Sequence, residues 1–308
     1  MCFKTSIISL LFLIAHTPLS AAPICGPSGV WLQVLGSGGP EITDGRASSG
    51  YIIWQAGRAR LLIDMGGGSL TRFEQSGASI NDLDAILLTH LHVDHTNDLP
   101  ALVKASFFTG RDRDLPIYGP TGNQLMPSTT AFVQGLFGTD GAFRYLQNNV
   151  DGTGRYRLLA EDVDNDGGKA TRVIDNEKFK LSAISVNHGP IPAIAWRVDI
   201  AGTSFVFSGD MSNNRDVLWR LASQADILIA HHAIPEKTNP VARSLHMPPS
   251  EIGKIAAKAK VKRVVLSHRM RRTFGKESES LSIIRKRYQG PVVFADDLQC
   301  FAIKKFKH

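Results

Sequence analysis

The sequence of 308 residues predicts an α/β fold, because apolar runs of strand length come first and then alternate with helical patterns. In the first part, strands are expected at 30–35, 50–55, 59–64 and 84–89. In the second part, strands are expected at 179–187, 193–199, 203–208, 226–230, 263–267 and 291–295. Helices are expected near 212–222, 248–259 and 277–288. Residues 129–148, which are rich in Phe, are expected to be helical and to form a lid or one wall of a pocket.

Metal-binding residue types are concentrated directly after the fourth expected strand. The segment Thr-His-Leu-His-Val-Asp-His at 89–95 places His90, His92, Asp94 and His95 within six positions. Neutral imidazoles and carboxylates suit Zn²⁺ and similar divalent metals. Four such side chains in one turn exceed what one tetrahedral ion needs beside any distant ligand, so the motif predicts two metal ions sharing the turn. Burying these groups without a metal would be costly.

Three more residues of the same kind stand at the ends of later expected strands. His188 follows the apolar run 181–186, Asp210 ends the segment 205–210, and His268 ends the segment 264–268. The carboxyl ends of strands in α/β folds are where sites are built. We therefore expect these three side chains to join the first motif.

A helix is expected to begin within this motif and to continue beyond it. Its apolar positions recur with a helical period, at Leu99, Leu102, Val103 and Phe107. These four side chains are expected to face the core.

The N-terminal segment has the features of a secretory signal peptide. Lys4 precedes an apolar stretch at 7–15, and small residues follow at 20–22. Residues 1–22 are therefore expected to be a signal peptide, and residues 23–308 one domain of a periplasmic or secreted protein. The alternative is an uncleaved N-terminal anchor. No later segment has the apolar length needed to span a bilayer.

Two cysteines, Cys25 and Cys300, would remain after cleavage. In an oxidising compartment they would form one disulfide between the two ends of the domain. Two unpaired thiols are the alternative.

The net charge of +7 comes from several basic runs, including 254–263 and 304–307. Such runs are usually solvated faces. The charge is compatible with an anionic substrate or a membrane surface, and it does not demonstrate nucleic-acid binding.

On these motifs the chain resembles the metallo-β-lactamase superfamily, whose signature is His-x-His-x-Asp-His followed by a distant His, Asp and His. Within it, the chain looks most like the ribonuclease Z and arylsulfatase-like branch. That likeness rests on the segments at 35–40, 62–67, 117–122 and 207–210, and it covers nearly all of the chain after residue 29. The resemblance implies a four-layer αβ/βα sandwich.

The resemblance also implies a ligand set for two Zn²⁺ ions, with Mn or Fe as alternatives. The first ion would be held by His90, His92 and His188, and the second by Asp94, His95 and His268, with Asp210 bridging. A hydroxide shared by the metals would attack the substrate. Asp64 matches a family residue that orients the metal-ligand turn, although a simple turn residue is the alternative.

Further residues are expected to act on the substrate. His246 matches a catalytic histidine of ribonuclease Z, and Asp94 and His246 are the expected catalytic residues; a loop histidine is the alternative for His246. Ribonuclease Z has a His-Glu pair where this chain has His231 and His232, which puts tRNA chemistry in doubt. His232 is expected to contact substrate instead.

Three arginines follow the last expected ligand directly, at 269, 271 and 272. Guanidinium groups beside a metal pair can clamp a phosphate or sulfate. Arg269 is the one expected to bind substrate, and solvated surface positions are the alternative for the others.

The function expected from the resemblance is an exported hydrolase of small phosphodiesters or aryl sulfates. Nucleic acid is not an expected partner, because an exported protein does not meet precursor tRNA. In addition, the family's tRNA-binding arm lies between the residues matched by His188 and Asp210, which are only 22 positions apart. A homodimer is compatible with the family. The alternatives are a lactonase or β-lactamase on the same site, or a non-catalytic metal-binding protein.

Overall fold

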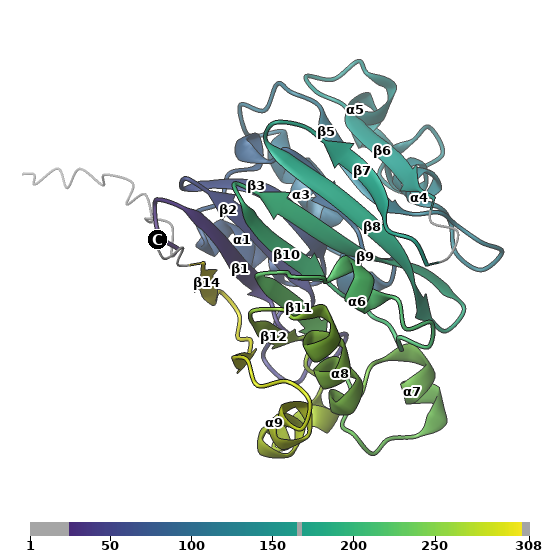
Figure 1. Cartoon of the computed structure of the whole chain (residues 1–308). Coiled ribbons are helices and arrows are strands. Elements are labelled where there is room, and N and C mark those ends of the chain that lie inside the picture. The colour runs from purple at the N-terminus through teal and green to yellow at the C-terminus, as the bar shows by residue number, and fades with distance from the viewer. Residues whose placement is uncertain (1–24, 165–167, 304–308) are drawn as a thin grey trace, which may run out of the picture.

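The computed structural model describes residues 25–164 and 168–303, and its strands form two seven-stranded sheets (Figure 1). The first sheet has the order β14-β1-β2-β3-β4-β5-β6, and the second has the order β13-β12-β11-β10-β9-β8-β7. In each sheet a set of antiparallel strands is joined to a set of parallel ones, which begins at β3 in the first sheet and at β10 in the second. The carboxyl ends of the parallel strands therefore form a common edge.

The strands are bounded as follows: β1 Val30–Gly36, β2 Gly50–Gln55, β3 Arg58–Met65, β4 Ala85–Leu87, β5 Leu115–Pro120, β6 Leu158–Val163, β7 Thr171–Asp175, β8 Phe179–His188, β9 Ile191–Ile200, β10 Thr203–Phe207, β11 Ile227–His231, β12 Val264–Ser267, β13 Val292–Phe294 and β14 Cys300–Ala302. The α-helices are α1 Ser69–Gln75, α2 Val93–Thr96, α3 Leu99–Ser106, α4 Thr129–Phe137, α5 Asn148–Asp151, α6 Leu218–Leu221, α7 Pro240–Leu245, α8 Pro249–Ala259 and α9 Glu277–Arg285. Short 3₁₀ helices are η1 Ile80–Asp82, η2 Arg144–Leu146 and η3 Arg271–Thr273.

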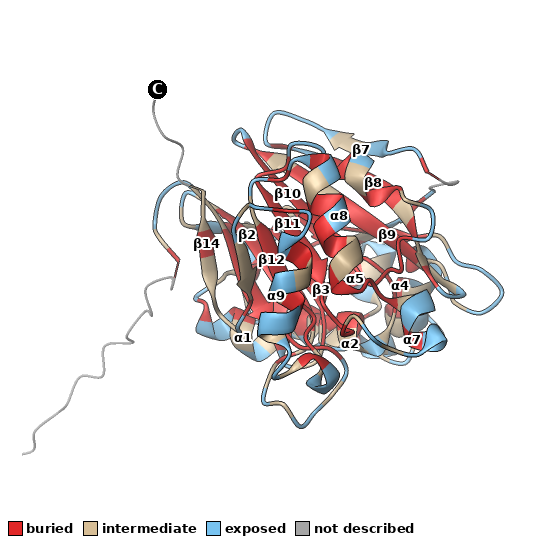
Figure 2. Cartoon of the chain, turned by 60° about the horizontal axis from the view of Figure 1, so that its bottom comes forward, coloured by how far each residue is buried: buried red, intermediate tan, exposed pale blue. Residues whose placement is uncertain are grey.

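Three groups of buried apolar side chains define four layers. One group lies between the two sheets, where Tyr51 and Phe207 have ring centroids 5.5 Å apart. A second group packs the first sheet against α1, α3 and α4, and a third packs the second sheet against α6, α8 and α9. Figure 2 shows most of the strands buried, the edge strand β7 partly exposed, and the outer faces of α7 and α9 largely exposed. The expected four-layer α/β sandwich is confirmed.

The expected helix after the metal-ligand motif is interrupted. Helix α2 ends at Thr96, and α3 begins at Leu99 with Pro100 in its first turn. Proline lacks an N–H and disfavours helical geometry in the residue before it, so a helix boundary falls here. Leu99, Leu102 and Val103 are buried as expected. The expectation for Phe107 was wrong, since this residue follows the end of α3 and is 61% exposed.

Two other helical expectations were too long. The helix expected at 212–222 is only the four-residue α6, because Asn213 and Asp216 have positive φ angles of 60° and 49°, which an α-helix cannot contain. Residues 129–148 form α4 and then, after Gly138 and Gly141, the short helices η2 and α5. The helices α1 and α7 and the strands β5, β6, β7 and β14 were not expected from the sequence.

A disulfide joins Cys25 to Cys300, with a Cα–Cα distance of 5.7 Å. It links the segment before β1 to β14, the strand that pairs with β1 at the edge of the first sheet. The expected signal peptide, residues 1–22, lies outside the described residues. Within the described ranges, no helix combines the length and apolar character required to cross a membrane.

Replacing both cysteines by serine is expected to lower the free energy of unfolding by roughly 2–4 kcal/mol, because the link closes a long loop in the unfolded chain. Urea unfolding of the wild type and the double variant, each with and without dithiothreitol, measures this. The reductant should destabilise the wild type only. Equal stability of the two proteins without reductant would contradict the prediction.

Candidate metal centre

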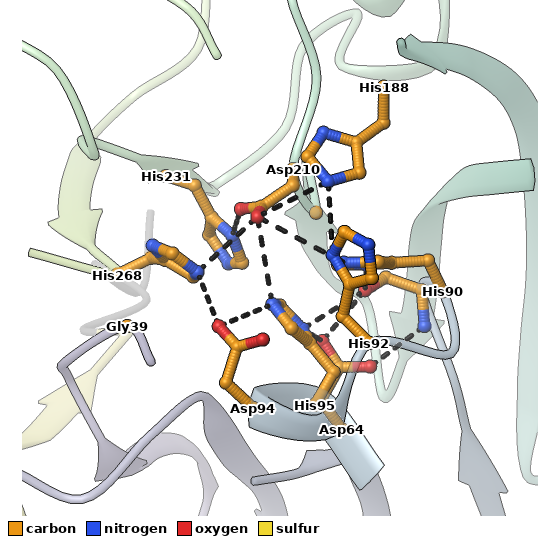
Figure 3. Close-up of polar contacts among 12 residues, drawn as sticks. Gly39, Asp64, His90, His92, Asp94, His95, His188, Asp210, His231 and His268 are labelled. Atoms are coloured by element: carbon orange, nitrogen blue, oxygen red, sulfur yellow. Dashed lines mark hydrogen bonds and ion pairs between the residues drawn. The ribbon is translucent and has the colours of Figure 1, made fainter. Parts of the chain in front are cut away.

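The candidate ligands come from both sheets and meet at the edge formed by the carboxyl ends of the parallel strands. The motif at 89–95 follows β4, His188 ends β8, Asp210 follows β10, His231 ends β11 and His268 follows β12. Figure 3 shows these side chains converging on one point. Each ligand is buried or half-buried, so the polar atoms face one another in a space with little solvent.

One half of the cluster consists of His90, His92, His188 and Asp210, whose candidate ligand atoms all lie within 4.8 Å of one another. His92 Nδ1 is 3.1 Å from His90 Nε2 and 3.3 Å from His188 Nε2. Asp210 Oδ2 is 4.0 Å from His90 Nε2 and 3.8 Å from His188 Nε2. Three imidazoles and a carboxylate thus surround one position.

The other half shares the same carboxylate oxygen. Asp210 Oδ2 is 3.8 Å from His95 Nε2 and 3.4 Å from His268 Nε2. Asp94 Oδ2 lies 3.1 Å from His268 Nε2 and 3.6 Å from His95 Nε2. Two imidazoles and two carboxylates thus surround a second position, with Asp210 between the two halves.

These residues fit a pair of divalent cations. His95 Nε2 is buried, points into the cluster and has no hydrogen-bond partner among the described residues. Four ring nitrogens of the candidate ligands lie 3.4–4.0 Å from Asp210 Oδ2, too far for most of them to satisfy their polarity by hydrogen bonding to it. Nitrogen and oxygen atoms converging in this way suit Zn²⁺ and similar metals. His90, His92 and His188 would hold one ion and Asp94, His95 and His268 the other, with Asp210 shared.

Asp64 orients the turn that carries the candidate ligands at 90–95. It is fully buried, and its carboxylate accepts hydrogen bonds from Thr89 N at 2.7 Å, Thr89 Oγ1 at 2.8 Å and His95 Nδ1 at 2.8 Å. The bond to Nδ1 turns Nε2 of His95 towards the cluster, the usual way in which a carboxylate orients a histidine ligand. A Cβ at Gly66 would overlap the carbonyl oxygen of Asp94, so glycine lets this strand end approach the turn.

The negative charges of the buried carboxylates favour a positive charge within the cluster. Burial disfavours the charged ring of His95, yet Asp64 and Asp94 raise the pKa of His95 to about 9. Burial alone would raise the pKa of Asp210, but His268 and His246 hold it well below its usual range. A site that stabilises a protonated imidazole and an ionised carboxylate also stabilises a bound cation.

His231 was not among the expected ligands, and the structure places it inside the cluster, where it has ligand-like spacing to His95, Asp210 and His268. Its Nδ1 donates a hydrogen bond to Asp210 Oδ1 at 2.8 Å, and its Nε2 lies 3.1 Å from Tyr51 Oη. Because both ring nitrogens are engaged, we assign His231 as a residue that positions Asp210. Its place at the end of β11 is the same signal that singled out His188.

His246 directly follows α7 and borders the cluster. Its Nδ1 is 3.8 Å from Asp210 Oδ2, and its ring centroid is 5.4 Å from that of His188. Nδ1 is buried and has no hydrogen-bond partner within the described part of the chain. Burial lowers the pKa of His246 to about 3, so the ring is neutral at neutral pH.

His232 and Arg269, the two residues expected to contact substrate, point away from the cluster. His232 is fully buried, and its Nε2 is 3.0 Å from Ser280 Oγ on α9. Arg269 is paired with Glu277 and lies between the rings of Phe274 and Phe294. In this arrangement both residues contact α9, through Ser280 and Glu277.

Arg272 interacts electrostatically with the cluster, whereas among the described residues no such interaction is seen for Arg269. The Nε of Arg272 donates to the carbonyl oxygen of Ala233 at 2.6 Å, and its charge acts on both Asp210 and His246. Within the described ranges it forms no salt bridge, although Glu41 lies close enough to affect its pKa. Arg271 instead donates to Thr43 Oγ1 on the surface.

Known proteins share this fold and this motif arrangement. Residues 59–269 match the family model described as the beta-lactamase superfamily domain. Ribonuclease Z of Mycobacterium bovis (strain BCG / Pasteur 1173P2) is 30% identical over 202 residues, which cover 64% of this chain and 68% of that protein. Ribonuclease Z of Mycolicibacterium paratuberculosis is 27% identical over 289 residues, which cover 87% and 96%. The crystal structure of the short form of human tRNase Z matches with a TM-score of 0.69 and 21% identity, over 89% of this chain and all of that one.

The chain therefore belongs to the metallo-β-lactamase superfamily, and it is a metal-dependent hydrolase. Within the superfamily it lies in the ribonuclease Z branch, as its motifs indicated.

Proposed function

We propose that this protein is an exported, dinuclear zinc-dependent hydrolase of small anionic esters, namely phosphodiesters or aryl sulfates. Two zinc ions bound in the cluster would polarise the ester and supply a water nucleophile at neutral pH. The imidazole-rich donor set supports zinc. The Cys25–Cys300 disulfide and the N-terminal signal-like segment support an oxidising compartment outside the cytoplasm.

The position of Arg272 is the observation that most strongly supports an anionic substrate. Its charge interacts with those of Asp210 and His246, its Nε donates to the carbonyl oxygen of Ala233, and its Nη2 lies 3.2 Å from Met270 Sδ. Among the described residues it forms no salt bridge with a carboxylate, so Nη1 and part of Nη2 remain available to a ligand. A planar guanidinium with free N–H groups is suited to two oxygens of a phosphate or sulfate. We infer that Arg272 orients a non-reacting oxygen of the phosphate or sulfate group. The organic group of the ester would extend away from the cluster.

His246 supplies a second polar group on the substrate side. As a neutral ring it keeps one N–H, and its Nδ1 edge lies 3.8 Å from Asp210 Oδ2. From that position the ring is able to donate a hydrogen bond to an ester oxygen that gains negative charge in the transition state. His231 donates a hydrogen bond to Asp210 Oδ1 and is itself in contact with Tyr51 Oη, so the shared carboxylate does not swing away when substrate binds.

RNA is the competing substrate class, because the curated relatives are ribonucleases Z. Between His188 and Asp210 the chain forms β9 and β10, joined by tight turns at Gly189–Pro190 and Ala201–Gly202. This segment has no room for an arm that could grip tRNA. The short segment supports a small ester over a folded RNA.

Arg272→Gln is expected to lower kcat/KM for bis-p-nitrophenyl phosphate about 10- to 100-fold, since a hydrogen bond to a charged group contributes about 1.5–3 kcal/mol. Turnover of the neutral ester p-nitrophenyl acetate should change less than about threefold. Steady-state kinetics on both substrates measures the difference.

Arg271→Gln is the matched control, because Arg271 is a neighbouring surface arginine whose side chain bonds Thr43. Its kinetics should equal those of the wild type. An equal loss on phosphodiester and acetate in Arg272→Gln, or no loss on either, would contradict the anion-binding role. Cleavage of a precursor tRNA at a rate above that of the small phosphodiester would move the assignment to RNA.

A further inference from the structure

A groove of about 500 Å³ lies beside the metal centre, on the outer side of the helices that follow the ligand motif. One wall is formed by α2 and α3, including Val93, Ala101 and Lys104, and the opposite wall by α4 and the residues after it, including Phe132 and Tyr145. This is the wall that residues 129–148 were expected to provide. The rings and aliphatic side chains make the groove mainly apolar.

Helix α2 connects the groove to the metal centre directly. Val93 stands between two candidate ligands, His92 and Asp94, and its side chain faces outward into the groove. It is 73% exposed and shares the groove with the apolar side chains of Phe132 and Leu136, and contiguous exposed apolar surface of this kind marks binding sites. Asn97, which follows α2, and Pro100 and Lys104 on α3 also line the groove.

Three aromatic side chains, those of Phe132, Phe143 and Tyr145, line the groove together with one cation, Lys104. Two further rings, those of Phe107 and Phe108, contact Lys104 without lining the groove. Lys104 Nζ lies 4.6 Å from the ring centroid of Phe107, 5.1 Å from that of Phe108 and 5.5 Å from that of Tyr145. The three rings near Lys104 Nζ are more than half exposed. Exposed aromatic side chains grouped around a groove are typical of ligand sites, since rings bind other rings with favourable stacking and edge contacts.

We propose that this groove binds the aryl group of the ester whose anionic centre lies at the metal centre. This inference rests on the proposed function and narrows its substrate class, from small anionic esters in general to those that carry an aromatic ring. The reacting group would sit between the cluster and Arg272, and the ring would pass over Val93 to lie between α3 and α4. Alkyl esters of similar charge would leave the groove unfilled.

Binding of phosphonates to the zinc-loaded protein tests the proposal without turnover. Isothermal titration calorimetry with methylphosphonate, phenylphosphonate and 2-naphthylphosphonate should give affinities that rise in that order. The wild type is expected to prefer naphthyl over methyl by at least tenfold, which is about 1.4 kcal/mol.

Ala101→Gln should remove this preference, reducing it below about threefold, because a polar side chain would occupy the groove without adding charge. Methylphosphonate affinity should stay within twofold. Ala105→Gln is the matched control: Ala105 is also an exposed alanine on α3, but it lines a different cleft against α1, and its variant should keep the wild-type preference. Leu136→Gln, on the α4 wall, is a second variant that should act like Ala101→Gln.

Three results would overturn the proposal: equal affinity of the wild type for methyl and naphthyl phosphonates, no binding of any phosphonate, or an unchanged preference in both groove variants. If Ala101→Gln altered the molecular mass in light scattering and left the preference intact, the groove would be an interface between two copies of the chain. Aryl preference in binding, without hydrolysis of any phosphodiester or sulfate, would refute the proposed function and leave the groove assignment standing.

Discussion

Asp210→Asn is expected to lower kcat/KM for bis-p-nitrophenyl phosphate by more than about 100-fold, beyond the 10- to 100-fold loss typical of removing a residue that only orients a ligand. Asp210 is the one carboxylate common to both candidate ligand groups, and Oδ2 faces four ring nitrogens of the candidate ligands. An amide has no charge to offset two cations, and its NH₂ group cannot serve as a ligand. Both metal positions would therefore be weakened by one substitution.

The measurement pairs steady-state kinetics with metal content by inductively coupled plasma mass spectrometry. The control is Asp216→Asn, which neutralises a half-buried carboxylate that pairs with Lys254 and Lys258 on α8 and contacts none of the candidate ligands. This control should retain both metal and activity. Wild-type turnover in Asp210→Asn, with a full metal complement, would show that the shared carboxylate is not part of the catalytic machinery.

Asp64→Asn is expected to weaken metal binding about 10- to 100-fold and to destabilise the fold by about 1–3 kcal/mol. The amide can accept from Thr89, but its NH₂ group would face the N–H of His95, so a buried donor loses its acceptor. The backbone should not change, because Asp64 has a φ of 53° and asparagine tolerates this left-handed conformation. Zinc competition with a chromogenic chelator measures the affinity, and urea unfolding measures the stability.

Asp226→Asn is the matched control for this experiment. Asp226 also accepts hydrogen bonds from a backbone N–H and a hydroxyl, those of Ser204, but it lies at the opposite end of β11 from the metal centre. Its variant should lose stability and keep zinc affinity. A comparable fall in zinc affinity in both variants would mean that Asp64 acts through general destabilisation and does not orient His95.

Most interior strands of the two sheets were predictable from sequence, whereas three of the four edge strands, β6, β7 and β14, and the interior strand β5 were not. Strands such as β2 and β10 are continuous apolar runs because both of their faces are covered, so their bounds followed directly from composition. The strand β14 has only three residues, and it forms because β1 offers a free edge, which is a tertiary cause. The overlong expectation at 212–222 failed for a local reason, the left-handed residues Asn213 and Asp216.

The expectation that metal-binding residues stand at the carboxyl ends of strands located the cluster. It could not decide which of two adjacent residues faces the cluster. His231 and His232 are adjacent at the end of a strand, where successive side chains point to opposite sides. Only the structure shows that His231 faces Asp210 and that His232 faces Ser280. The same limit applies to the arginines: Arg269 is sequestered by Glu277, and it is Arg272 that lies near the cluster.

The most direct test of the central claim is the turnover of bis-p-nitrophenyl phosphate and p-nitrophenyl sulfate by the purified mature protein, before and after metal removal by a chelator, with bound zinc counted in parallel. The account predicts two zinc ions per chain, cleavage of at least one of these anionic esters, loss of that activity on chelation, and its return on adding zinc. Cleavage that persists after the metal is removed would contradict the account. So would a fully zinc-loaded protein that hydrolyses only p-nitrophenyl acetate, a lactone or nitrocefin.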